Sequence, residues 1–236
     1  MPTDFAHLHV RSHCSFMGGT ATVDDLAARA AADGMARLAL TDANGLYGAV
    51  AFDRACRAVG VAPILGMALT VAPLAEVART AGTPPGSPAA APAELTLLAT
   101  GPAGYRALCR LSSALQGRPD REAAARQGVG WRNLADDADG LVCIVGGRRG
   151  WIGRCLAAGD ARAARAYAER LAAVFGDRTY VGLELHGAGD DAIARAAAGV
   201  AAAAGLPTVA VQPVFCLAPE DRDRLHLLAA IAANRP

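Results

Sequence analysis

Two histidines, an arginine and an aspartate occupy positions where an α/β fold could bring them together. His7, His9 and Arg11 alternate along the first apolar segment of the chain, and Asp42 ends the next such segment. Residues at i, i+2 and i+4 of a strand share one face, so the first three side chains are predicted to point into the same space. Two imidazoles and a carboxylate could hold a divalent metal that activates water for phosphoester hydrolysis.

Short apolar runs that alternate with helical patterns must position these side chains. This alternation is typical of parallel β/α units, whose strands are buried on both faces. Seven strands are predicted, at 5–10, 37–42, 61–71, 95–100, 140–146, 179–185 and 206–212. In a parallel β/α barrel the working side chains lie at the C-terminal ends of the strands, which is where His9, Arg11 and Asp42 fall.

Helices are predicted between the strands. Thr22 and Asp25 form a candidate capping box for a helix that Gly34 ends, and Asp190 is a candidate cap for a helix that Gly205 ends. The other predicted helices are 48–59, 103–116 and 160–175, with a further helical start at Pro219. The segment 79–93 is expected to be a flexible Pro/Ala-rich insertion and 117–130 a polar loop. Neither is expected to divide the chain, so 1–236 is predicted to be a single domain.

Composition limits the classes of function. At 236 residues and 53% hydrophobic content, the chain can form one large α/β domain. A formal charge of +1 gives no global field that would attract nucleic acid. The chain has no signal-like start and no apolar run of about 18 residues, so a cytoplasmic protein without membrane contact is expected. Six cysteines without a C-x-x-C pair are expected to be buried free thiols.

Several segments together resemble a known family. They are HLHVRSHCSFMGGT, LALTDANGLYGAVAFDRACRAVGVAPILGMALTVAP, LTLLATGPAGYRALCRLSSAL, GLVCIVGG and LPTVAVQPVFCLAPEDRDRLHLLAAI. In order and spacing they are similar to the PHP (polymerase and histidinol phosphatase-like) domain of bacterial C-family DNA polymerase III alpha subunits, and most similar to the error-prone polymerase branch. The resemblance implies a distorted (β/α)7 barrel of the PHP type, in agreement with the seven predicted strands.

The resemblance also implies a set of metal ligands, and this chain departs from that set repeatedly. Where active members carry His-x-His at the end of the first strand, this chain has His9 and Arg11. Glycine replaces the aspartate of the following turn, alanine replaces two more ligands, and an aromatic segment replaces a closing Asp-x-His. These positions are Gly18, Ala43, Ala68 and Pro213-Val214-Phe215. His7, His9 and Asp42 remain as a vestigial set that could bind Zn, Mn or Mg.

A guanidinium places a positive charge where a cation should sit, so neither catalytic residues nor a cofactor is expected. Arg11 is instead predicted to form a salt bridge with Asp42 or to bind an anion. The predicted function is a non-catalytic structural module that packs against polymerase domains in cis or in trans, among replication or repair proteins, with DNA reached through the parent polymerase. The alternatives are a metal-dependent phosphoesterase or 3'-5' exonuclease, and a protein that binds a small phosphorylated ligand through Arg11. We also expect that a chain of this length does not copy DNA by itself.

A second candidate surface is basic. Arg148, Arg149 and Arg154 surround Trp151, and such a cluster could contact a nucleic-acid backbone. The alternative is a solvated loop at a helix start, which the neutral total charge favours. The remaining candidates are interpreted as structural: His13, His186 and His226 have no ligand partner at useful spacing, and Trp131 and Trp151 are expected to pack in the core or at its rim.

Overall fold

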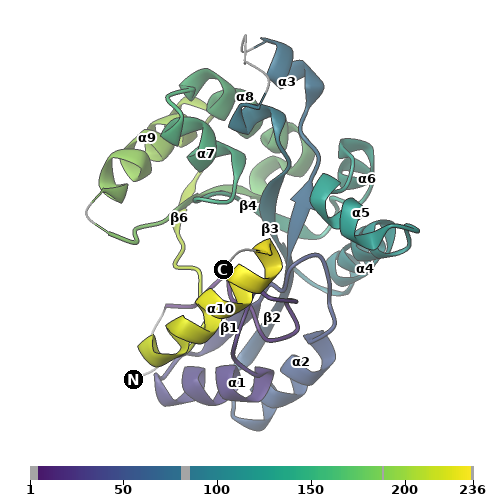
Figure 1. The fold of residues 1–236 in the computed structure, drawn as a ribbon, viewed down its shortest axis with the longest axis vertical. Coiled ribbons are helices and arrows are strands. Elements are labelled where there is room, and N and C mark those ends of the chain that lie inside the picture. The colour runs from purple at the N-terminus through teal and green to yellow at the C-terminus, as the bar shows by residue number, and fades with distance from the viewer. Residues whose placement is uncertain (1–4, 81–85, 188, 235–236) are drawn as a thin grey trace. The chain divides into compact units, whose positions relative to one another are not determined.

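The computed structural model describes residues 5–80, 86–187 and 189–234. The chain divides into two compact units, one made of Met1–Ala68 with Pro213–Pro236 and the other of Leu69–Gln212. The strand order follows the chain, from β1 to β6. The fold is mixed α/β (Figure 1).

The first unit places helices beside a parallel strand pair. Its elements are α1 (Val23–Ala32), β1 (Arg37–Leu40), α2 (Ala49–Ala58), the start of β2 (Ala62–Val71), η3 (Pro219–Asp221) and α10 (Arg222–Ala233). β1 and β2 pair in parallel from Arg37 opposite Ala62 to Leu40 opposite Leu65. Thr22 caps α1 by accepting a hydrogen bond from the Asp25 amide, as predicted. The helices α1 and α2 meet β1 at a core that includes Val10, Leu26, Leu40, Phe52 and Cys56.

The second unit contains the larger strand set. Its strands are the end of β2, β3 (Ala93–Ala99), β4 (Leu141–Gly146), β5 (Thr179–Leu183) and β6 (Thr208–Ala210). Its helices are α3 (Ala75–Thr80), η1 (Pro88–Ala90), α4 (Pro102–Gln116), α5 (Arg121–Gln127), α6 (Trp131–Asp136), α7 (Trp151–Ala157), α8 (Ala161–Phe175), η2 (Gly176–Arg178) and α9 (Asp190–Ala203). β4, β5 and β6 run parallel, and α7, α8 and α9 pack together beside them (Figure 1).

Three stacked aromatic rings fill the core of the second unit. Trp151 and Tyr167 are parallel with ring centroids 4.2 Å apart, and Trp131 stacks on Trp151 at 5.6 Å. The polar atoms of the three rings bind main-chain carbonyls before α3, within η1 and directly after η1. The Trp131 indole donates to the Ala72 carbonyl, the Trp151 indole to the Ala91 carbonyl and the Tyr167 hydroxyl to the Ala89 carbonyl. The packing role predicted for the two tryptophans is confirmed.

Six of the seven predicted strands form. The first, at 5–10, does not, and only one bridge between Val10 and Val214 remains of it. The reason is that the segment from His7 to Val10 contains one residue more than the stretch of β1 that it faces. The carbonyls of His7 and Val10, three residues apart, accept from the amides of Ala39 and Thr41, which are two apart. This mismatch is that of a β-bulge, and it interrupts the alternation on which the prediction relied.

The parallel arrangement is broken between β3 and β4, which are antiparallel, with Thr96 opposite Ile144. The chain enters β4 at the end where β3 finished. The amide and the hydroxyl of Thr100 both donate to the Gly140 carbonyl, at 2.9 and 3.0 Å. A side chain at Gly104 would collide with that same carbonyl, so glycine permits the close approach. Three helices rather than one connect these two strands.

The two segments predicted as an insertion and a loop each contain a short helix. The segment 117–130 contains α5, because Asp120 caps it by accepting from the Ala123 amide, and the prediction of a plain loop was wrong there. Part of the predicted insertion at 79–93, residues 81–85, lies outside the described residues. The later part of the segment is packed against the unit, because Ser87 caps η1 and Ala89 is fully buried.

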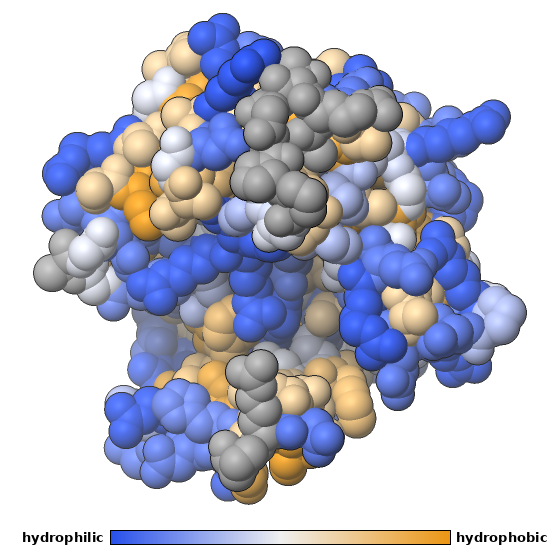
Figure 2. All heavy atoms as spheres, turned by 45° about the horizontal axis from the view of Figure 1, so that its top comes forward, coloured by the Kyte–Doolittle hydropathy of each residue, from blue (hydrophilic) through white to orange (hydrophobic). Residues whose placement is uncertain are grey.

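The helices of the described residues include none that is long and apolar enough to cross a membrane. Figure 2 shows a face where hydrophilic side chains predominate and hydrophobic ones lie in smaller areas between them. Single exposed apolar residues are ordinary on such a surface.

Candidate functional site

The bulge interrupts the predicted alternation of His7, His9 and Arg11 along one face of a strand. His7 packs edge-on against Phe5, with ring centroids 4.9 Å apart, and lines a groove of about 160 Å³ beside α1. Val10, three residues along, lines the same groove. The extra residue thus places His7 and Val10 at one groove, and the prediction that His7 shares a space with His9 and Arg11 stays a prediction.

His9 and Arg11 do meet, on the ring of Phe215. The His9 ring stands edge-on to Phe215 with centroids 5.9 Å apart. The Arg11 guanidinium carbon lies 5.3 Å from the centroid of the same ring, within the range of a cation–π interaction. The Arg11 amide also donates to the Val214 carbonyl at 2.9 Å, and the Val214 amide to the His9 carbonyl at 2.9 Å. Main chain and side chains together join the N-terminal segment to residues 214–215.

Gly18 adjoins the same cluster. A Cβ atom at this position would lie 3.4 Å from Nη1 of Arg11. The guanidinium therefore occupies the space toward which a side chain at residue 18 would point. Arg11 is 4% exposed, so an anion in solution cannot reach it without local opening. That burial counts against the predicted anion site.

Asp42 is held by two serines that the sequence prediction did not identify. Its Oδ1 accepts from the Ser12 amide at 2.8 Å and the Ser15 hydroxyl at 2.7 Å, and its Oδ2 accepts from the Ser12 hydroxyl at 2.9 Å. These donors, rather than Arg11, satisfy the carboxylate within the described residues. The predicted salt bridge between Arg11 and Asp42 is replaced because Ser12 and Ser15 approach from the intervening turn. The Ser-x-x-Ser spacing after the first apolar segment was the available signal.

The alanines at two expected ligand positions lie beside Asp42. Ala43 and Ala68 form a parallel bridge, the Asn44 amide donates to the Ala68 carbonyl at 2.9 Å, and the Ala68 amide donates to the Asp42 carbonyl at 3.1 Å. The first unit therefore brings together the positions singled out in the sequence. At these two positions it presents methyl groups to the site.

Few donors for a divalent metal are offered here by the part of the chain that the structure describes. Among the described residues, no three His, Cys, Asp or Glu side chains gather in a group that could hold a metal ion. Both oxygens of Asp42 already accept hydrogen bonds, and a metal would have to displace them. The buried positive charge of Arg11 further opposes a cation in this region.

The predicted basic surface lies in the second unit, where each arginine has an internal partner. Arg148 donates through Nη2 to both oxygens of Asp190 at 2.9 Å. Arg149 lies 4.0 Å from Glu94, and Arg154 donates to the Pro92 carbonyl at 2.7 Å. Each arginine side chain thus has a partner within the unit, which the sequence could not show because the nearest of these partners in the chain is 42 residues away.

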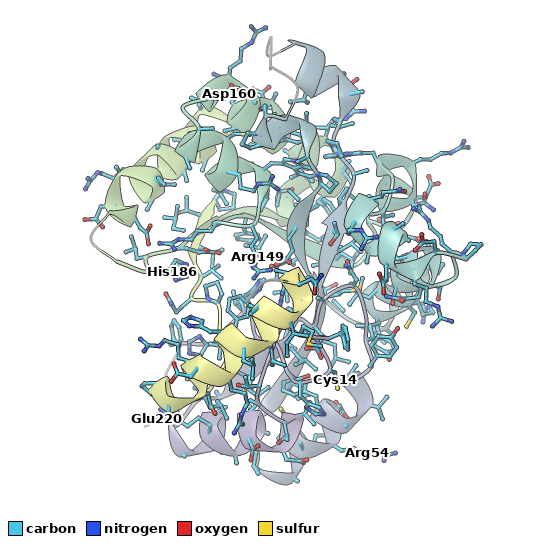
Figure 3. The ribbon with its side chains drawn as sticks, in the orientation of Figure 1. Cys14, Arg54, Arg149, Asp160, His186 and Glu220 are labelled. Carbon is cyan, nitrogen blue, oxygen red and sulfur yellow. The ribbon has the colours of Figure 1, made fainter. Side chains whose placement is uncertain are left out.

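A polar cluster that sequence reasoning missed follows β5. Glu184 accepts from the Arg148 amide at 3.2 Å and lies 3.0 Å from Nε2 of His186. Asp190 accepts from the His186 amide at 2.6 Å, and this bond, with Arg148, lowers the pKa of Asp190 below its ordinary value of 3.8. Glu184, Asp190 and Arg148 line a cavity of about 230 Å³ whose other walls are mainly glycine and aliphatic residues. Figure 3 marks His186 and Arg149, which come from the loops after β5 and β4.

Comparison with known protein families finds the PHP domain over residues 7–186. The chain belongs to the PHP domain family. Relatives of this PHP domain include an error-prone DNA polymerase from Symbiobacterium thermophilum, 38% identical over 228 residues, which cover 89% of the chain and 19% of the relative. The DNA polymerase III subunit alpha of Bacillus subtilis is 29% identical over 230 residues, covering 98% of the chain and 19% of the relative. The resemblance read from the sequence motifs is confirmed.

The chain spans about one fifth of the length of these polymerases. The error-prone DNA polymerase of Mycobacterium tuberculosis strain H37Rv fits the same pattern, with 35% identity over 241 residues that cover 98% of the chain and 20% of the relative. Among solved structures, an amidohydrolase from Chromobacterium violaceum superposes with a TM-score of 0.53 at 14% identity, covering 94% of this chain and 96% of that one. At this level of identity the likeness concerns the fold alone.

Proposed function

We propose that this PHP domain is a non-catalytic structural module of a C-family DNA polymerase, of the polymerase III alpha or error-prone type. One observation carries the proposal: His9, Arg11 and Phe215 pack on one another where the family resemblance implies metal ligands. A guanidinium and a phenyl ring cannot coordinate a cation. The interactions that a metal would supply between the two segments are made here by packing and main-chain hydrogen bonds.

The relatives support the setting. The error-prone polymerase and the polymerase III alpha chain contain a segment similar to 89% and 98% of this chain, and each is about five times as long as that segment. We therefore propose polymerase domains, in cis or in trans, as the principal partner, with replication or repair proteins in the same cytoplasmic assembly. DNA is reached through the polymerase rather than through Arg148, Arg149 and Arg154, because each of these has a partner within its own unit.

We also infer the finer fold, a distorted (β/α)7 barrel of the PHP type. Six strands follow one another in chain order, and the bridge between Val10 and Val214 supplies the place of a seventh. The likeness to the amidohydrolase over most of both chains supports this inference.

The test measures metal binding and hydrolysis together. The purified chain is incubated with Zn²⁺, Mn²⁺ or Mg²⁺ and desalted, its metal content is measured, and a chromogenic phosphodiester is offered as substrate. We expect less than about 0.1 equivalent of metal, no turnover, and an unfolding midpoint unchanged by a chelator, because a bound metal would stabilise the folded state.

The matched control restores the family's donors in the same chain, as Arg11→His, Gly18→Asp, Ala43→His and Ala68→Glu together. This variant is expected to bind more metal than the wild type, which shows that the measurement can detect a site. Stoichiometric metal with phosphodiester or 3'-5' exonuclease activity in the wild-type chain would reject the proposal in favour of a metal-dependent hydrolase.

A further inference from the structure

The cavity of about 230 Å³ in the second unit is lined by none of the residues that carry the proposed function. It lies where the parallel strands β4 and β5 end, because Gly147 and Arg148 follow β4 and Glu184 follows β5. The helices α7 and α9, which pack on each other, form its sides (Figure 1). Ligands of α/β sheets bind outside the carboxyl ends of parallel strands, which is the position of this cavity.

The size and walls of the cavity limit its ligand. A cavity of about 150 Å³ holds benzene, so 230 Å³ corresponds to about nine non-hydrogen atoms. Cofactors and drug-sized molecules need about 300–1,000 Å³. Most of the walls are aliphatic, among them Leu183, Ile193 and Ala197, and the described residues that line the cavity include no aromatic side chain on which a nucleobase could stack. The ligand is therefore small, with an aliphatic body.

Glu184 offers this cavity a carboxylate oxygen that the described residues leave without a donor. Its Oε2 accepts from the Arg148 amide at 3.2 Å and lies 3.0 Å from Nε2 of His186, whereas its Oε1 accepts from none of them. A Cβ atom at Gly147 would overlap Oε1, so glycine makes room for the carboxylate. The Glu184 side chain is only 15% exposed, and a carboxylate oxygen buried to this extent is stabilised by a donor.

The charges of the lining decide which kind of ligand fits. Arg148 and Asp190 neutralise each other, because Nη2 of Arg148 lies 2.9 Å from both carboxylate oxygens. Arg154 donates through Nη1 to the Pro92 carbonyl at 2.7 Å, and no carboxylate of the described residues forms an ion pair with it. One carboxylate, of Glu184, and one guanidinium, of Arg154, therefore remain. A simple cation would be repelled by the guanidinium and a phosphate by the carboxylate, whereas a molecule with both charges suits the pair.

We propose that this cavity binds a small zwitterion with an aliphatic body, of the class of the aliphatic amino acids. Oε1 of Glu184 accepts from the ammonium group, the guanidinium of Arg154 donates to the carboxylate, and the carbon chain packs against Ile193 and Ala194 of α9. The site does not depend on the proposed function, because the two use different residues and either can fail alone.

The test uses two isomeric zwitterions and two analogues that each lack one charge. The zwitterions are L-leucine and 6-aminohexanoate, which differ in the spacing of their charges. Isopentylamine keeps only the positive charge and 4-methylpentanoate only the negative one. Binding to the purified chain is measured by calorimetry and by NMR spectra of the isoleucine methyl groups. Of the five isoleucines, Ile193 lines the cavity, whereas Ile64 and Ile231 belong to the first unit.

We expect at least one zwitterion to bind saturably to one site and to shift the methyl signal of Ile193 but not those of Ile64 and Ile231. Each singly charged analogue should bind at least about tenfold more weakly, because it loses a hydrogen bond between charged groups. The inference is overturned if neither zwitterion saturates a site at up to about 20 mM, or if only the signals of Ile64 or Ile231 shift. An analogue that binds as tightly as the zwitterions would overturn it too.

Two variants with matched controls locate the site. Glu184→Gln keeps the size of the side chain and removes its charge, so it should weaken zwitterion binding at least about tenfold, whereas Glu122→Gln, 87% exposed on α5, should not. Ala194→Leu fills the cavity and should abolish binding, whereas Ala196→Leu, exposed on the same helix, should not. If Glu184→Gln does not fold, the result for Ala194→Leu decides. Binding that survives in the cavity-filled variant would place the ligand elsewhere and reject the site.

Discussion

The guanidinium of Arg11 lies over the ring of Phe215, with its central carbon 5.3 Å from the ring centroid. The two residues are far apart in the chain but belong to the same compact unit, and the main chains beside them are hydrogen-bonded. Because Arg11 is buried, the interaction is little screened by water. It therefore joins the N-terminal and C-terminal segments of this unit with an energy that can be measured.

A double-mutant cycle should detect this pair. Arg11→Met and Phe215→Leu are each expected to reduce the free energy of unfolding in urea, with a coupling energy of about 0.5–2 kcal/mol between them. The control cycle combines Phe215→Leu with Arg54→Met, because Arg54 is an exposed residue of α2 (Figure 3). Strict additivity in the Arg11 cycle would show that the charge and the ring do not interact.

Removal of the Ser15 hydroxyl should destabilise the first unit more than an ordinary serine substitution does. Ser15→Ala deletes a hydrogen bond to the buried carboxylate of Asp42 and one from the Ala43 amide. A hydrogen bond to a buried charged group contributes about 1.5–3 kcal/mol, so a loss of that size is expected in urea unfolding. Ser113→Ala, at an exposed position on α4, should change the free energy by less than about 0.5 kcal/mol. Equal effects of the two substitutions would count against the cluster.

Local patterns predicted most elements of the fold. Apolar runs identified six strands, and Thr22, Gly34 and the helical periodicity located α1 closely. Two features could not be predicted in this way. The bulge near His7 depends on which amides of β1 bind the segment, and the antiparallel β3 depends on the approach of Gly104 to Gly140. Both are relations between distant parts of the chain, which spacing alone does not encode.

The candidate site could be predicted only in part, because it too depends on contacts between distant parts of the chain. The substitutions at Arg11 and Gly18 can be seen in the sequence, and the structure places both residues together. The partners of Asp42 were missed because Asp42 and Arg11, at the ends of two predicted strands, suggested an ion pair. In the structure the hydroxyls of Ser12 and Ser15 donate to the Asp42 carboxylate. The pairing of Arg148 with Asp190, 42 residues away, likewise has no local signal.

Loss of the Tyr167 hydroxyl should loosen the second unit without disturbing its aromatic stack. The hydroxyl donates to the Ala89 carbonyl at 2.6 Å and accepts from the Leu74 amide at 3.2 Å, and burial raises the pKa of Tyr167 to about 12. Tyr167→Phe keeps the ring but leaves these buried groups without a partner, at a cost of about 1–3 kcal/mol in urea unfolding. Tyr47→Phe, on the exposed turn, serves as the control and should be nearly neutral. A Tyr167 variant as stable as the wild type would show that the two hydrogen bonds contribute nothing.

The dependence of stability on acid should include a contribution from Asp190. Its pKa is lowered in the folded state, first by the hydrogen bond from the His186 amide and then by Arg148. The unfolded chain therefore binds a proton more readily at acidic pH, so this contribution is fully present above pH 3.8, the ordinary pKa, and is lost as the pH falls through the lower folded value. Asp190→Asn should flatten the fall in the free energy of unfolding as the pH drops below 3.8, measured by urea titration. Asp191→Asn, exposed in the same helical turn, should leave the slope unchanged, and an equal flattening in both variants would mean that the effect comes from net charge rather than from the bonds to His186 and Arg148.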